Sequence, residues 1–380
     1  MFSQKARLLV CQRDERDSVA EARTQLTNCC SADTHAPLVT IVIVNHNYSQ
    51  FVEQCIRSVD EQDYPNLQCI IVECASNDGS LPIIEKALGQ AKSPFFELIR
   101  RDVNHGHVLN SLSALDTVKG IFLTFLDADD FLFPEFVSTH VNAHLNDVNS
   151  AAVSVTDQIQ VNAANQVLAG TCHWHQKWRA SEHGTAWIDL SHARTWTPSS
   201  PCRMEQLNSP RLYFIPAWWS SWLMERWIWS ATSGIMFRKS VMESLVPSIE
   251  QHADLRLDFA LDGHFARFAH SVGGTLVVDS AQGAYRRHGK NMWSSNQVLG
   301  GQTPNGLHDQ VGRFQNSQLV ARRTLVTKHQ DFLRLLGAEL YYSIAWQLMS
   351  NAEFIDFVKS HEEDRATWEK TIEIAGAARR

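Results

Sequence analysis

The sequence predicts an α/β protein in which a mostly parallel sheet is flanked by helices. From Pro37 to about residue 150, short β-branched apolar runs alternate with segments of helical periodicity, as expected for strand–helix–strand units with right-handed crossovers. Nine of the 12 Trp lie between Trp174 and Trp229 and predict an aromatic-rich insert. From about Ser295 onward the chain reads as a helical C-terminal extension.

The elements follow in order along the chain. The run from Val39 to Asn47 is rich in β-branched residues and nearly continuous in its hydrophobicity, as in a buried parallel strand. A helix follows, with Ser49 available as its N-cap. Further strands are expected from residue 69 into an Asn-Asp-Gly turn, over 96–100, from 120 to the carboxylates after residue 126, around 153–155 and over 274–280. The helices between them are marked by Ile84–Ala91, Val108–Leu115, Val137–Val148 and Asp262–Ser271.

The 380 residues fit two domains, or one domain with long additions. We expect a polar leader over 1–36, one half of an α/β domain over 37–150, a second half with the Trp-rich insert over 151–294, and the helical extension over 295–380.

Charge and composition exclude several classes of protein. The net charge of −7 gives no general attraction to nucleic acid, so no nucleic-acid partner is expected. The N-terminus lacks the pattern of a signal peptide, and no uncharged apolar run approaches the roughly 20 residues of a membrane span. The eight Cys form no Cys-x-x-Cys pair, and Cys55 and Cys69 read as small core residues. We therefore expect a cytoplasmic protein, with peripheral contact at the inner face of the membrane as an alternative.

Polar residues end three of the expected strands. Asn45, Glu73 and Asp127 follow apolar runs, and ligands of open α/β sheets bind outside the carboxyl ends of the strands. Asp127, Asp129 and Asp130 would repel one another unless a cation neutralised them. Mg²⁺ prefers one or two carboxylates together with phosphate oxygens. The alternative is a solvated Asp-rich turn that caps the next helix.

Over residues 37 to about 292 the sequence resembles an inverting glycosyltransferase of family 2, which has the GT-A fold. The resemblance rests on five segments in order. PLVTIVIVNHN is similar to the opening strand, IIVECASNDGS to the second strand and its turn, and GHVLNSL followed by LDADD to the segment ending in Asp-x-Asp. Asp262 with Gly273 eleven positions later matches the spacing around the catalytic acid, and YRRHGKN resembles the closing loop.

The resemblance implies that residues 37–150 form the nucleotide-sugar-binding half and that residues 151–294 form the acceptor-binding and catalytic half. It also implies roles for the donor site. Asn45 and Asn47 would lie near the nucleotide base, and Glu73 stands where the family usually has a base-binding Asp. Asp127 would contact the ribose. Asp129 would bind Mg²⁺ or Mn²⁺, which bridges the diphosphate of a UDP- or GDP-sugar. Asn110 is a further candidate contact to the nucleotide-sugar, or else an exposed helix residue.

Asp262 would be the general base of the reaction, with its pKa raised by desolvation. Leu261 replaces the acidic partner that the family more often shows, and Asp258 is a second candidate base. His288 would be a third metal ligand or a structural residue. The neighbouring Arg286 and Arg287 could instead clamp the leaving diphosphate.

The Trp-rich insert occupies the place of acceptor-specific elements in the family. Aromatic rings stack on sugar faces, so the candidate acceptor contacts are Trp219, Trp222, Trp229 and Ser233. An aromatic core and membrane contact are the alternatives. The resulting hypothesis is a metal-dependent glycosyltransferase in surface polysaccharide or glycolipid synthesis, acting with inversion on a glycan or glycolipid hydroxyl. A catalytically inactive nucleotide-sugar or glycan-binding protein on the same fold is the alternative.

Overall fold

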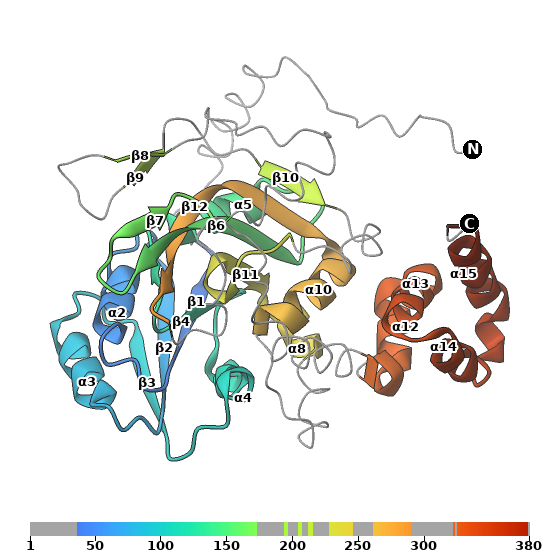
Figure 1. The fold of residues 1–380 in the computed structure, drawn as a ribbon, viewed down its shortest axis with the longest axis horizontal. Helices are drawn as coiled ribbons and strands as arrows, with labels where there is room; N and C mark the ends of the chain where they lie inside the picture. Colours follow the sequence, from blue (N-terminus) through green and yellow to red (C-terminus); the bar gives the residue numbers. More distant parts are fainter. Residues whose placement is uncertain are drawn as a thin grey trace. The chain divides into compact units, whose positions relative to one another are not determined.

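The structure is a computed structural model that describes residues 36–172, 194–196, 204–206, 212–215, 228–245, 261–289, 322–323 and 325–378. Residues 37–380 form one compact unit. Figure 1 shows the described strands and helices, coloured along the sequence. Residues 1–35 of the expected leader and most of the Trp-rich insert lie outside the described residues.

A ten-stranded mixed sheet forms the centre of this unit. Its main path runs in the order β10-β12-β6-β11-β4-β1-β2-β3, with β5 paired to β12 and β7 paired to β6. Six of the eight strands on this path run in the same direction. The exceptions are β11, which is antiparallel to both of its neighbours, and the edge strand β10, which is antiparallel to β12. The predicted mostly parallel sheet is therefore confirmed. The strands are β1 (Val39–Asn45), β2 (Leu67–Cys74), β3 (Phe96–Arg101), β4 (Phe122–Asp127), β5 (Phe131–Leu132), β6 (Val153–Asn162), β7 (Val167–Ala169), β10 (Leu212–Ile215), β11 (Ile235–Arg238) and β12 (Thr275–Arg287).

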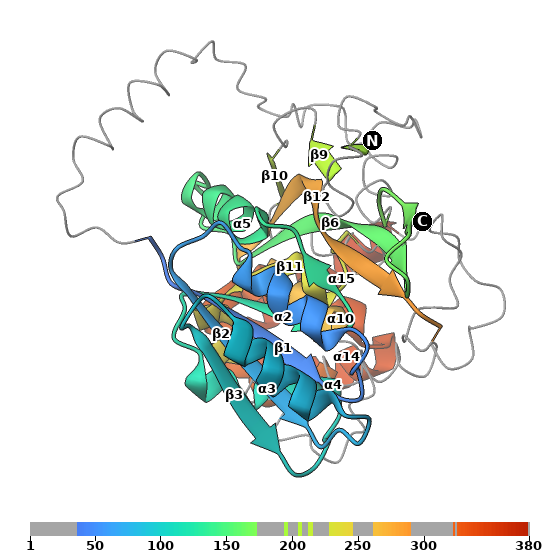
Figure 2. The same cartoon turned by 90° about the vertical axis from the view of Figure 1, so that its left-hand side faces the viewer.

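Helices cover both faces of the sheet, as the near-continuous apolar strands require. One face of β1 and β2 packs against α2 (Val52–Asp60), α3 (Ser80–Gln90) and α5 (Phe136–Leu145). The opposite face packs against α4 (His107–Leu112), α8 (Lys239–Leu245) and α10 (Leu261–Gly273). Figure 2 shows α2 and α3 lying over the parallel strands β1 to β3.

Cys55 and Cys69 are fully buried in the layer formed with α2 and α3, so their predicted place in the core is confirmed. The candidate site lies at the carboxyl ends of β1, β2 and β4.

Three local predictions were wrong. Ser49 does not cap α2: the N-cap is Phe51 without a side-chain hydrogen bond, and the Ser49 amide donates to Asp78 instead. α5 ends at Leu145, so Leu145 and Val148 are exposed and do not continue its apolar face. The segment expected as a strand followed by a loop is one strand, β12, which continues to Arg287 because it pairs with β6 along that length.

The C-terminal region is helical, as predicted. It contains α12 (His329–Leu336), α13 (Ala338–Leu348), α14 (Asn351–Val358), the short 3-10 turn η5 (Glu362–Asp364) and α15 (Arg365–Ala378). Among the helices that the structure describes, none combines the length and the apolarity needed to cross a bilayer. A separate two-stranded sheet joins β8 (Arg194–Trp196) and β9 (Met204–Gln206).

Candidate active site

The strand register brings the predicted residues to one edge of the sheet. Asn45 at the end of β1 is opposite Glu73 on β2, and Val44 is opposite Asp127 at the end of β4. These three residues follow largely apolar stretches of their strands, and the parallel pairing of β1 with β2 and β4 brings them to the same edge of the sheet. The edge combines two groups of residues, one at β1 and β2 and one at β4.

At the ends of β1 and β2, Asn45 and Glu73 bind each other. Asn45 Nδ2 donates to Glu73 Oε2 over 2.5 Å, and the backbone amide of Ser76 donates to Glu73 Oε1 over 2.8 Å. Both side chains are buried. The longer Glu side chain is thus turned inward against its own loop. Asn45 Oδ1 is buried and has no hydrogen-bond partner among the described residues.

The loops that leave these two strands are joined by Asn47. Its backbone amide donates to Ser76 Oγ over 3.0 Å, and its Oδ1 accepts from the Asn77 amide over 2.9 Å. Asn47 and Ala75 adopt left-handed backbone conformations, with φ of 61° and 53°. Such conformations are rare for residues other than Gly, are unfavourable by about 1–3 kcal/mol, and cluster at functional sites.

Asp127 at the end of β4 forms an ion pair with His107, with 2.7 Å between Oδ1 and Nε2. Gly106, with φ of 88°, precedes His107 and makes the turn into α4. Desolvation by burial alone would lower the pKa of His107. The charges of Asp127, Asp262 and Asp129 and the hydrogen bond to Asp127 outweigh it and raise that pKa. The neighbouring carboxylates thus favour the protonated form of the imidazole.

Asp129 pairs with His288 from the end of β12, with 2.9 Å between Oδ2 and Nε2. The two side chains are 9% and 6% exposed, so they form a largely desolvated pair. Burial and the charge of Asp127 raise the pKa of Asp129, although His288 acts in the opposite direction. The rings of Tyr48 and Phe51 pack against the His288 ring, at centroid distances of 5.7 and 5.1 Å.

The Asp130 side chain is fully buried, and both of its carboxylate oxygens accept hydrogen bonds. Its Oδ2 accepts from Ser233 Oγ over 2.7 Å, and its Oδ1 accepts from the Arg286 amide over 2.9 Å. Burial and the charges of Asp129 and Asp127 raise its pKa well above the ordinary value. Asp130 therefore connects the turn after β4 to β12 and is not a solvated Asp of a surface turn.

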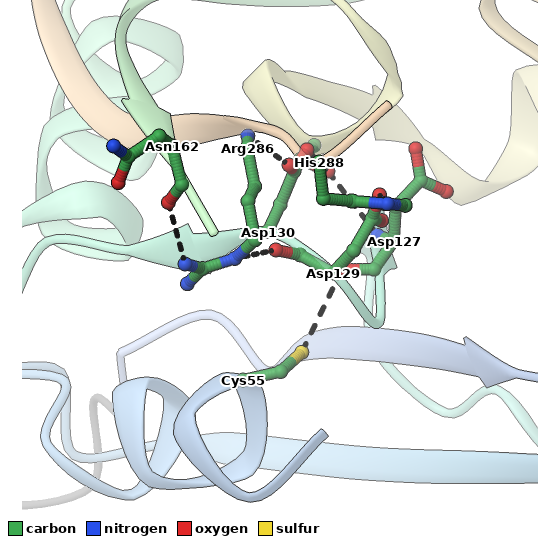
Figure 3. Close-up of polar contacts among 8 residues, drawn as sticks. Cys55, Asp127, Asp129, Asp130, Asn162, Arg286 and His288 are labelled. Atoms are coloured by element: carbon green, nitrogen blue, oxygen red, sulfur yellow. Dashed lines mark hydrogen bonds and ion pairs between the residues drawn. The ribbon is translucent and has the colours of Figure 1, made fainter. Parts of the chain in front are cut away.

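Arg286 holds the backbone of the carboxylate turn. Its guanidinium donates to the backbone oxygens of Asp129 (2.6 Å) and Asn162 (3.2 Å), as Figure 3 shows. The guanidinium also lies over the Phe51 ring at 4.7 Å. It also donates to the side chains of Asn165 and Gln54. Since Arg286 is 1% exposed, the alternative that it clamps a diphosphate is wrong for this residue. A buried, fully hydrogen-bonded guanidinium fixes geometry.

Asp262 lies in the first turn of α10, where a carboxylate interacts favourably with the helix dipole. It is 8% exposed. Burial and, to a smaller extent, the charge of Asp127 raise the pKa of Asp262, while the hydrogen bond from the Gly263 amide and the charge of His107 lower it, and the net result is a pKa of about 7. The carboxylate is thus half-ionised near neutral pH. Leu261, beside it, is fully buried in the core and anchors the start of the helix.

The donor set fits a divalent cation bound together with phosphate oxygens. Asp129 and His288 place two donor atoms 2.9 Å apart, and repulsion between buried carboxylates is relieved by a cation. Asp127 does not complete a three-donor group with them within 4.8 Å. The two side chains would therefore supply only part of the coordination, as is usual for Mg²⁺ at phosphates.

Other predicted contacts have different roles. Asn110 is 2% exposed and holds the preceding loop by donating to Asn104 Oδ1 over 2.7 Å. It is therefore not an exposed helix residue, and its contact with a nucleotide-sugar stays a prediction. Trp229 is fully buried and donates to Thr275 Oγ1. Ser233 is fully buried beneath Asp130. Core packing engages both side chains, in agreement with the aromatic-core alternative for Trp229, and the acceptor roles of Trp229 and Ser233 stay predictions.

Trp219, Trp222 and Asp258 lie outside the described residues. His107 is the residue that sequence reasoning missed. It belongs to the GHVLNSL segment, but a single His before a helix gives no signal of its partner. Only the placement of α4 beside the end of β4 pairs it with Asp127.

The family model of glycosyl transferase family 2 matches residues 40–193. This stretch contains β1 to β7 and both carboxylates of the Asp-x-Asp turn. The sheet order and the flanking helices agree with the GT-A fold that the sequence predicts.

Two curated relatives come from Pasteurella multocida. A hyaluronan synthase is 29% identical over 145 residues, which cover 37% of this chain and 14% of the relative. A chondroitin synthase is 29% identical over 138 residues, which cover 36% of this chain and 14% of the relative. The matched part is thus about one seventh of each relative. Among solved structures, a mannosyltransferase from Pyrobaculum calidifontis in complex with GDP-Man and Mn²⁺ aligns over 95% of this chain and 87% of its own, with a TM-score of 0.45 and 15% identity.

Proposed function

Since this chain is a member of glycosyl transferase family 2 through residues 40–193, we propose that it transfers a sugar from a nucleoside-diphosphate sugar to a hydroxyl of a glycan or glycolipid, with inversion. The observation that carries the proposal is the meeting of Asp127, Asp129 and Asp262 with two imidazoles at the carboxyl edge of one sheet. The names of the relatives favour an acceptor in polysaccharide synthesis.

The donor would bind over the ends of β1, β2 and β4. The loops after β1 and β2, which Asn47 joins by hydrogen bonds, would bind the base. Asn45 Oδ1, which has no hydrogen-bond partner among the described residues, would accept a hydrogen bond from it. Glu73 would act by holding Asn45, since both of its carboxylate oxygens are engaged within the loop. Asp127, fixed through Oδ1 by His107, would offer its other oxygen to the ribose hydroxyls. His107 would also offset part of the negative charge near the diphosphate.

Asp129 and His288 would hold Mg²⁺ or Mn²⁺. When bound, the cation would neutralise charge on the departing nucleoside diphosphate. The protein's own contribution is the rigid placement of these two ligands: Arg286 binds the Asp129 carbonyl, and Phe51 and Tyr48 pack against the His288 ring.

Asp262 would take the proton of the acceptor hydroxyl as the oxygen attacks the anomeric carbon on the face opposite the diphosphate. The bond to the diphosphate oxygen breaks as the new glycosidic bond forms, which inverts the configuration. A carboxylate with a pKa of about 7 is suited to this role, because it is a stronger base than an ordinary Asp yet is still substantially ionised at neutral pH.

The pH dependence of transfer tests this proposal. With a panel of UDP- and GDP-sugars, Mn²⁺ and oligosaccharide acceptors, kcat/KM should fall about tenfold per pH unit below a pKa near 7, because the base must be ionised. His107→Gln should move this limb to higher pH. The imidazole of His107 lowers the pKa of Asp262. Without it, the negative charge of Asp127, which raises the pKa of Asp262, also has no ion-pair partner in His107.

His105→Gln is the matched control, since His105 is exposed on the same loop and should leave the limb in place. The proposed base is contradicted by transfer that stays constant between pH 5 and pH 8, or by a limb that the two variants shift equally. Absence of transfer with every donor would contradict the proposed activity itself.

A further inference from the structure

A second group of metal-binding side chains lies in the C-terminal helical region, outside the candidate active site. His329 begins α12, while Glu363 and Asp364 belong to η5, between α14 and α15. One donor atom from each of the three side chains lies within 4.8 Å of the other two. The three residues come from segments more than 30 positions apart in the sequence, so the folding of the helices brings them together.

His329 distinguishes this group from an ordinary cluster of surface carboxylates. It is 7% exposed, and neither of its ring nitrogens has a hydrogen-bond partner among the described residues. Buried polar groups are normally paired. The ring is enclosed by Tyr341, Phe357 and His361, at centroid distances of 5.1, 5.9 and 3.9 Å. An unpaired nitrogen therefore faces two carboxylates inside an otherwise aromatic setting.

One of the carboxylates is oriented by a further residue. Tyr342 donates its hydroxyl to Asp364 Oδ2 over 2.8 Å. Hydrogen bonds of this kind typically fix the orientation of metal-binding carboxylates. Glu363 is exposed, so the group has both an anchored side and a side open to solvent, through which an ion could enter.

We propose that His329, Glu363 and Asp364 bind one Zn²⁺ ion, with water completing the coordination. One imidazole and two carboxylates suit Zn²⁺. Ca²⁺ and Mg²⁺ prefer sites made of oxygen ligands alone. The ion would connect the start of α12 to the turn between α14 and α15 and so hold the C-terminal helices together. This inference does not depend on the proposed transferase activity.

The test is Zn²⁺ binding to the full chain after removal of metals, measured by equilibrium dialysis and by the change in Tm. Asp129→Asn is introduced throughout, so that binding at the candidate active site is weakened. We expect one Zn²⁺ per chain and a rise in Tm on binding. Glu363→Gln and His329→Gln should each raise the Kd at least about tenfold, because even the loss of an outer hydrogen bond to a ligand costs roughly 10–100-fold.

Glu362→Gln is the matched control, since Glu362 is an exposed neighbour that pairs with Arg365 at 3.5 Å and is not part of the group. It should leave the Kd unchanged. Tyr342→Phe should weaken binding without removing a ligand. The proposal is overturned if the chain with Asp129→Asn binds no Zn²⁺, or if Glu363→Gln and Glu362→Gln bind Zn²⁺ with the same Kd.

Discussion

Asp262→Asn is expected to lower kcat for sugar transfer by about 10²–10⁴-fold, the usual contribution of a positioned general base. The amide keeps the size of the side chain but cannot take the acceptor proton. Binding of the donor should change little, because Asp262 lies on α10 and the proposed donor contacts come from β1, β2 and β4. The variant should stay folded, since burial already disfavours the ionised carboxylate that the substitution removes. Steady-state kinetics and donor titration by calorimetry measure the two effects.

Asp331→Asn provides the control for this substitution. Asp331 also lies in the first turn of a helix, α12, but is exposed. It reproduces the loss of a carboxylate near a helix N-terminus without touching the site. If Asp262→Asn retains full kcat, Asp262 is not the base. If it loses donor binding in parallel with transfer, its role lies in holding the donor.

Asp129→Asn is expected to lower transfer by roughly 10²–10³-fold, the scale on which loss of one group that stabilises transition-state charge is felt. The affinity for Mn²⁺ in the presence of a nucleoside diphosphate should fall as well. The fold should tolerate the change, because the pKa of Asp129 is raised by burial and by the charge of Asp127. An uncharged amide removes that repulsion.

Chelation provides an independent check on Asp129. Removal of divalent metal should lower transfer by the wild-type chain by a similar factor and cause little further loss in Asp129→Asn, because both changes remove the same cation. Asp116→Asn, at an exposed position after α4, should behave like wild type. A chelator that leaves wild-type transfer unchanged would show that the carboxylate turn works without a metal.

The sheet and its flanking helices could be predicted from the sequence because their signals are local. Apolar runs such as Val39 to Val44 are buried along their whole length, and the carboxyl ends of parallel strands must meet at one edge. Thus Asn45, Glu73 and Asp127 could be placed together before their contacts were known. The continuation of β12 to Arg287 could not be predicted, because it depends on pairing with β6.

The contacts that could not be predicted depend on long-range packing. From the sequence, Arg286 is a candidate diphosphate clamp and Ser233 a candidate acceptor contact. In the structure, they hold the backbone and side chains of the turn after β4. Trp229 resembles its aromatic neighbours in the insert, yet it is fully buried and bonded to Thr275. The sequence alone does not show which Trp residues of the insert pack against the sheet and which remain exposed.

The configuration of the new glycosidic bond tests the central claim most directly. Wild-type chain, Mn²⁺, a nucleotide-sugar of known anomeric configuration and an oligosaccharide acceptor are incubated, and the anomeric signal of the product is followed by NMR. Direct displacement assisted by Asp262 predicts a bond of inverted configuration that forms with release of nucleoside diphosphate and is lost in Asp262→Asn. A product of retained configuration, or metal-dependent donor binding that yields no bond with any acceptor, would contradict this account.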